Sequence, residues 1–228
     1  MEHCEVSRII LDVYETCNIK NFPIDCIDVI KKLKIPLYRY SELSEIKERE
    51  CYKVSDDAFK LRGKIYYNDS FPYVRRQRFT LMHEVGHILL SHNGDTKEND
   101  DEANEFASHF LAPRIMIHKY RCETADQIHE IFGLSYKASN KALVDYREWY
   151  KNIAQTTHRP SAPERQLELF MEKVCHANTN SEEIEEEGDY ELTPKEIYAD
   201  IRRTLKAGLP LSPKYASLYR MYQKMGLK

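Results

Sequence analysis

Two histidines and a glutamate at a fixed spacing carry the clearest chemical signal in this chain. His83, Glu84 and His87 form the pattern H-E-x-x-H. On a helix, which turns by about 100° per residue, His83 and His87 lie only about 40° apart, so both imidazoles can reach one zinc ion at about 2.0–2.1 Å. Glu84 lies one step around the helix, close to the metal but free to act on its bound water. The spacing therefore predicts a Zn²⁺ site with a base beside it.

The chemistry expected of such a site is amide hydrolysis. Zinc lowers the pKa of bound water from about 15.7 to about 7, so hydroxide becomes available at neutral pH. A carboxylate beside the metal, here Glu84, can take the proton and later deliver it to the leaving amine. Two imidazoles and a carboxylate suit zinc, although the residues alone do not distinguish zinc from manganese.

The surrounding sequence indicates that the motif lies in the protein interior. One long helix is predicted from Pro72 to His92, with Asn93-Gly94 as its stop. Apolar residues recur around the motif as a core helix needs: Phe79, Leu81, Met82, Val85, Ile88, Leu89 and Leu90. Gly86 costs about 1 kcal/mol relative to Ala inside a helix, so we expect a packing or access reason for it near the metal. This setting argues against two core histidines with ordinary partners.

A catalytic zinc site uses three protein ligands and keeps one position open, so a third ligand is expected. The candidates are acids on the next predicted helix, which spans 100–111: Asp100, Asp101, Glu102 and Glu105. The helix dipole favours carboxylates in the first turn, which explains Asp100 and Asp101 without a metal. Glu102 is favoured as the ligand because it flanks the apolar stripe that must face the first helix.

Other roles around the metal stay open. The metzincin pattern is excluded, because Leu90 and Asn93 stand where that pattern needs Gly and His. No residue is assigned to stabilising an oxyanion. The sequence offers only nearby polar candidates for that role: Tyr66, Tyr67, Tyr73 and His92.

Two segments together resemble the ImmA/IrrE family of metallopeptidases. RFTLMHEVGHILLSH (78–92), followed by DEANEFASHFLAP (101–113), is similar to the family's paired signature, F-T-x-x-H-E-x-G-H-x-x-L and E-A-N-x-F-A-x-x-x-L-x-P. The resemblance covers about residues 20–150 and implies that the first Glu of E-A-N, here Glu102, is the third zinc ligand. The sequence departs from the pattern at His109, for which we expect an exposed polar position, with a direction toward the metal as the alternative.

The resemblance also implies a function. A member of this family is expected to be a zinc-dependent endopeptidase that cleaves a helix-turn-helix transcriptional repressor of a mobile element or stress regulon. Composition and spacing do not show this substrate. The alternative is a non-catalytic metal-containing binding module or a toxin–antitoxin component. The intact Glu84 favours the enzyme, because a purely structural metal site would not need it.

The expected fold is α+β: a mainly helical, zincin-like metallopeptidase with a small sheet of about three strands. Strands are predicted at 37–40, in CYKV at 51–54, and in a hairpin at 58–67 that turns at Arg62-Gly63. An edge of this sheet could accept an extended substrate by strand addition. Helices are predicted over 4–18, 24–34, 72–92, 100–111, 124–132 and 135–150.

The predicted domain organisation has three parts. Residues 1–150 form the metallopeptidase domain, 151–192 a linker and 193–228 a basic helical tail. The linker is acidic at 181–191, which holds seven acids and no base, a composition that favours a solvated segment. The tail from 192 onward holds eight bases and two acids, so its net charge is +6.

The segment 124–147 resembles a helix-turn-helix pair, with Gly133 at the turn. Lys137, Asn140 and Lys141 could then face DNA. A helical hairpin packed on the peptidase is the favoured interpretation, because the second helix mixes acids with its bases. Direct nucleic-acid binding is therefore an alternative that the sequence does not favour, and a protein substrate is the expected partner.

Bulk properties exclude several other classes. The 228 residues carry a formal net charge of -3, so no overall field points to nucleic acid or to a membrane surface. The N-terminus lacks the apolar core of a signal peptide, and no run approaches the roughly 18 apolar residues of a membrane span. The six cysteines are scattered and are expected to be free thiols. We therefore expect a cytoplasmic protein.

Overall fold

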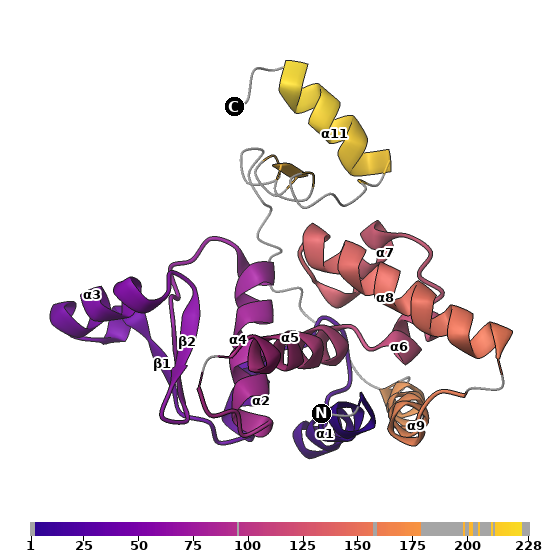
Figure 1. The fold of residues 1–228 in the computed structure, drawn as a ribbon, viewed down its shortest axis with the longest axis horizontal. Coiled ribbons are helices and arrows are strands. Elements are labelled where there is room, and N and C mark those ends of the chain that lie inside the picture. The colour runs from indigo at the N-terminus through magenta and orange to yellow at the C-terminus, as the bar shows by residue number, and fades with distance from the viewer. Residues whose placement is uncertain are drawn as a thin grey trace.

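The computed structural model describes residues 3–94, 96–156, 159–178 and 213–224, together with the single positions 198, 201, 202, 205 and 211. The described chain is mostly helical and holds a three-stranded sheet, so the predicted α+β class is confirmed. Figure 1 shows the helix that carries H-E-x-x-H between this sheet on one side and a helical pair on the other.

The sheet comprises β1 (Leu37–Arg39), β2 (Ala58–Leu61) and β3 (Lys64–Tyr67), in the order β1-β3-β2. Strand β1 runs parallel to the central strand β3, and β2 runs antiparallel to it. The predicted hairpin is confirmed at Arg62 and Gly63, whose φ angles of 50° and 73° suit a two-residue turn. The strand predicted in CYKV is wrong, because these residues form the last turn of helix α3 (Glu45–Val54).

Helices α4 (Val74–Leu89) and α5 (Lys97–Leu111) cross each other at the centre of the molecule (Figure 1). Leu81, Met82 and Val85 of α4 are fully buried, as are Phe106 and Phe110 of α5. Burial of these apolar stripes on both helices stabilises the crossing. The metal motif therefore lies on a rigid, buried element, as its sequence predicts.

The segment after α5 forms three helices. They are α6 (Arg114–Lys119), α7 (Ala125–Phe132) and α8 (Tyr136–Gln155). Gly133 ends α7 with a φ of 61°, and the hydroxyl of Ser135 accepts a hydrogen bond from the amide of Ala138 at the start of α8. The predicted helical pair is therefore present.

Helix α1 (His3–Cys17) packs against a helix that the sequence did not indicate, α9 (Ala162–Asn178). Leu167 and Met171 of α9 belong to the hydrophobic core. The linker predicted over 151–192 is therefore wrong for this stretch, because two apolar side chains one turn apart suffice to bury one face of a charged helix. The acidic run at 181–191 lies outside the described residues.

The remaining elements are short or terminal: α2 (Cys26–Lys32), the 3-10 turn η1 (Tyr40–Glu42) and α11 (Pro213–Lys224). Helix α11 lies within the predicted basic helical tail, most of whose other residues lie outside the described part of the chain. Four cysteines in the described chain are buried free thiols. No helix among the described residues has the length and apolar character to cross a membrane.

Candidate metal centre

Helix α4 places the two motif histidines side by side. The Nε2 atoms of His83 and His87 lie 3.0 Å apart, and the ring planes meet at 78°. Two nitrogens bound to one tetrahedral zinc at about 2.0–2.1 Å would be about 3.3 Å apart, which is close to the observed separation. The predicted pairing of these imidazoles on one helix face therefore fits a zinc ion.

Burial keeps both imidazoles in the neutral form that binds metal. Loss of solvent around His83 lowers the pKa of its ring below the usual value. Burial lowers the pKa of His87 more strongly, to about 4, and repulsion from a charged His83 or His92 acts in the same direction. At neutral pH both rings can offer a nitrogen lone pair without first losing a proton.

Each ring also has a contact on its other nitrogen. Nδ1 of His83 lies 3.0 Å from the amide oxygen Oδ1 of Asn104, so the ring donates from Nδ1 and leaves Nε2 free to accept a metal. Nδ1 of His87 lies 3.0 Å from Nδ1 of the buried His92. Outer contacts of this kind fix the tautomer and orientation of metal ligands. Sequence reasoning left Asn104 out, although it is the third residue of E-A-N.

Two carboxylates compete for the third ligand position. Oδ1 of Asp100 lies 3.3 Å from Nε2 of His87, and His83, His87 and Asp100 form one group whose ligand atoms lie within 4.8 Å of one another. Oε2 of Glu102 instead lies 3.0 Å from Nε2 of His92. In this structure Glu102 therefore reaches the metal histidines through His92, whereas the exposed Asp100 contacts them directly.

The other acids of α5 lie elsewhere. Asp101 is exposed, and the Glu105 carboxylate faces His109 at 3.8 Å. His109 is neither exposed nor directed at the metal: its Nε2 pairs with Asp145 of α8 at 3.0 Å, and only 12% of its side chain is exposed. The expectation of an exposed polar position is wrong, because α8 covers this face of α5.

A close helix crossing explains Gly86. A Cβ atom at this position would lie 3.0 Å from Cδ1 of Phe106 and 3.3 Å from the backbone of Ala103. Both residues are fully buried on α5. The predicted packing reason for Gly86 is therefore found: a side chain here would push apart the two helices that carry the candidate ligands.

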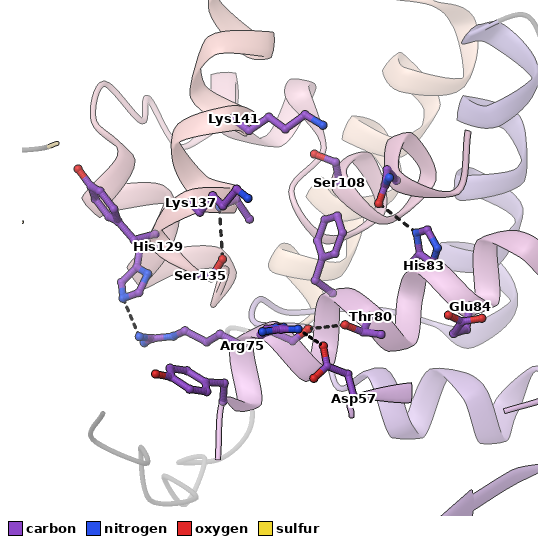
Figure 2. Close-up of a pocket in the computed structure, with 16 residues that line it drawn as sticks. Asp57, Arg75, Thr80, His83, Glu84, Ser108, His129, Ser135, Lys137 and Lys141 are labelled. Carbon is purple, nitrogen blue, oxygen red and sulfur yellow. Dashed lines mark hydrogen bonds and ion pairs between the residues drawn. The ribbon is translucent and has the colours of Figure 1, made fainter. Parts of the chain in front are cut away.

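A cavity of about 880 Å³ opens beside the histidines. His83 and Glu84 of α4 lie on one side of it, with Ser108 of α5 (Figure 2). Asn104 of α5, which contacts His83, also lines it. Helices α7 and α8 form the opposite wall, which sequence reasoning did not connect with the motif. A cavity of this size, next to a metal-binding pair and a carboxylate, can hold a peptide segment.

The four residues suggested to stabilise an oxyanion differ in whether they face the cavity. Tyr73 lines the cavity. Tyr66 stacks between Tyr38 and Phe59 on the sheet, and the hydroxyl of Tyr67 accepts a hydrogen bond from Arg39 at 3.1 Å. His92 is occupied by its contacts to His87 and Glu102. Tyr73 is therefore the one of these four residues that faces the cavity.

The fold and the site together define an α+β domain with a histidine pair that could hold a metal ion, on a buried H-E-x-x-H helix. Residues 37–144 match the family described as the IrrE N-terminal-like domain, Peptidase_M78. This part of the chain thus matches a domain of the ImmA/IrrE family, as the two motifs predict, and the match supports a metallopeptidase role. No match was found among curated proteins or solved structures.

Proposed function

We propose that this protein is a zinc-dependent endopeptidase. His83 and His87 hold the metal, Glu102 completes the ligand set as the family resemblance implies, and Glu84 is the catalytic base. The observation that carries the proposal is the pair of neutral imidazoles, 3.0 Å apart at Nε2, beside a cavity that Glu84 also lines. The proposed metal site therefore lies directly beside a cavity that could hold the substrate.

Each residue of the proposed site has a separate role in metal binding or proton transfer. His83 presents Nε2 because Asn104 engages its Nδ1, and His87 is oriented by its contact with His92. Zinc, when bound, would polarise the scissile carbonyl and acidify water. Glu84 takes a proton from the attacking water and passes it to the leaving amine, which requires a carboxylate at the cavity wall and not in the ligand set.

The proposed substrate is a helix-turn-helix transcriptional repressor, and the proposed place of action is the cytoplasm, where such a repressor works. Both come from the family resemblance and not from the geometry. The rival function, a non-catalytic metal-containing binding module or toxin–antitoxin component, keeps the metal and does not need Glu84.

Substitution of Glu84 separates these functions, and substitution of both histidines tests the metal site that the two functions share. Purified wild-type protein should carry about one zinc per chain, and His83→Ala/His87→Ala should carry none. Glu84→Gln should retain zinc and fold but lose cleavage of a coexpressed repressor by at least about 100-fold, because a general base contributes about 10²–10⁴. Metal analysis and mass spectrometry of the repressor fragments measure both. Equal cleavage by Glu84→Gln and wild type, or no cleavage by either, would reject the peptidase.

A further inference from the structure

The lining of the cavity beside the metal histidines is strongly cationic, with basic side chains from both α4 and α8. Four basic side chains line the cavity: Arg75, Arg76, Lys137 and Lys141. Among the residues that the structure describes, only two carboxylates join them, those of Asp57 and Glu84. Because the catalytic role is assigned to Glu84, Asp57 is the one acid of this described lining that remains to balance these charges.

The Asp57 carboxylate already forms an ion pair with one of these basic side chains. Its Oδ2 lies 2.6 Å from Nη2 of Arg76, and only 9% of the Asp57 side chain is exposed. The Nη1 atom of Arg75 lies 2.6 Å from Nε2 of the buried His129. An imidazole carries no negative charge, so this contact does not balance the charge of the guanidinium.

Lys137 and Lys141 are exposed and stand one turn apart on α8. None of the ion pairs formed within the described part of the chain includes Lys137, Lys141 or Arg75. Figure 2 shows both lysines extending from α8 toward the side of the cavity that carries Ser108 and His83. Three unbalanced cations therefore face the space beside the metal pair.

The same placement bears on DNA binding. Of the three residues that could face DNA, Asn140 is buried and its amide donates to the carbonyl of Tyr136 at 3.1 Å. The other two, Lys137 and Lys141, line the peptidase cavity. A nucleic acid that contacted these lysines would therefore lie at the cavity that His83 and Glu84 also line.

We infer that this cationic wall, formed by Arg75, Lys137 and Lys141, selects a substrate segment with acidic side chains next to the scissile bond. The inference rests on the proposed peptidase function and adds its substrate class. Single exposed ion pairs contribute little, but several like charges in one concave site attract an opposite charge together. Charge complementarity acts mainly on specificity, so the wall should rank peptides and not change the chemistry.

The test compares two pools of randomised decapeptides on full-length, zinc-loaded protein. One pool has Glu at fixed alternating positions, and the other has Gln at the same positions. Wild type should cleave the Glu pool faster by about three- to tenfold, and Lys137→Gln/Lys141→Gln should remove that preference. Lys137→Glu/Lys141→Glu should make the Gln pool the better substrate. The lysines are exposed, so we expect these variants to fold, and thermal unfolding and zinc content verify this.

A matched control removes the same charge elsewhere. Lys47 of α3 and Lys151 of α8 are exposed and lie outside the cavity. Lys47→Gln/Lys151→Gln should keep the wild-type preference. An absent preference in wild type, or the same preference in the cavity variants, overturns the inference. Faster cleavage of both pools by Lys137→Gln/Lys141→Gln also overturns it, since the wall would then hold an inhibitory segment of the chain itself.

Binding separates this inference from the proposed function. Fluorescently labelled pools are titrated onto the Glu84→Gln protein with and without the lysine substitutions. If wild type cleaves neither pool and also leaves the coexpressed repressor intact, the peptidase proposal fails, and a lysine-dependent preference for the Glu pool in binding still supports an acidic peptide ligand. Equal binding of both pools overturns the inference. Tighter lysine-dependent binding of a single-stranded oligonucleotide than of the Glu pool also overturns it, in favour of a nucleic-acid site.

Discussion

At the scale of single residues, the third ligand is the sharpest question. Glu102 follows from the family resemblance, but in the structure the Asp100 carboxylate is nearer to His87. A rotation of the Glu102 side chain away from His92 would be needed to bring it to the metal. The two assignments differ in what each substitution removes.

If Glu102 is the ligand, Glu102→Ala should weaken zinc binding by at least about tenfold, and Asp100→Ala should leave it unchanged. Competition with a chelator of known zinc affinity measures both variants, with Asp101→Ala as the exposed control from the same helix turn. The opposite order would assign Asp100 as ligand. Glu102 would then orient His87 indirectly, through its contact with His92.

A second residue-scale prediction concerns pH. The unfolded chain protonates His87 near pH 6.5, whereas the folded, metal-free protein does so only near pH 4, because burial lowers the pKa. Between these values the unfolded state binds more protons. The contribution of His87 to stability is therefore complete above about pH 6.5 and falls as the pH drops toward 4, by at most about 3 kcal/mol.

Urea unfolding of chelator-treated protein at several pH values between 7.5 and 4.5 measures this loss. His87→Gln should flatten the dependence, and substitution of the exposed His118 should not. A stability that stays constant over this interval in wild type would show that the two states titrate alike.

At the scale of elements, local patterns predicted the parts whose signals are local. The hairpin follows from Arg62-Gly63, and the metal helix follows from its apolar stripe. CYKV has β-rich residues, but the helix N-terminal to it continues through them, so tertiary context overrides propensity. Helix α9 was missed because its buried residues, Leu167 and Met171, are outnumbered by charged neighbours.

The site shows the same limit. Spacing within one helix predicted the pairing of His83 with His87, which the structure shows. The residue pattern of a single helix does not determine its contacts with other helices. The position of Asp100 beside His87 and the position of Lys137 and Lys141 at the cavity were therefore not predicted. Which carboxylate binds depends on differences of a few ångströms in how α5 crosses α4.

Gly86 tests that crossing. Gly86→Ala should gain about 1 kcal/mol of helix propensity, but overpacking a tight core contact costs about 1–3 kcal/mol. Phe106 has little room to move, because it is fully buried and stacks on Phe110 at 5.6 Å. We expect a net loss of about 1 kcal/mol, or a fall in Tm of about 2–4 °C, and weaker zinc binding.

Thermal unfolding with and without a chelator measures both effects of Gly86→Ala. Thr80→Ala, on the cavity side of the same helix, is the control and should leave Tm within about 2 °C. A raised Tm with unchanged zinc affinity would show that the contact between α4 and α5 can accommodate a methyl group at position 86.

At the scale of the whole molecule, the peptidase unit extends further along the chain than the motifs suggest. Leu167 and Met171 of α9 are 3% and 0% exposed, against the side of the core that α1 covers. Arg114 and Glu164 join α6 to the start of α9 at 3.2 Å, with 13% and 11% of their side chains exposed. In the described tail, Tyr198 stacks on Tyr219 of α11 at 5.7 Å, and the fully buried Ile201 belongs to the hydrophobic core. We propose a boundary after α9, with the acidic run between the two parts and a contact of Ile201 with the core across it.

Two truncations test this boundary. Deletion of 179–228 should leave zinc content and cleavage of a short peptide unchanged, because it removes neither α9 nor any described residue that lines the cavity. It should lower Tm by a few degrees, because Ile201 is lost from the core. Deletion of 156–228 should lower stability by several kcal/mol, since it exposes the apolar face of α1 and removes Leu167 and Met171 from the core.

If the basic tail captures the protein substrate, deletion of 179–228 should also slow cleavage of the intact repressor, by raising KM with kcat unchanged. Salt should weaken repressor binding more in the full-length protein than in the truncated one, because a tail of charge +6 is screened over about 8 Å at physiological ionic strength. Loss of zinc on deletion of 179–228 would place the tail within the peptidase unit and move the boundary beyond it.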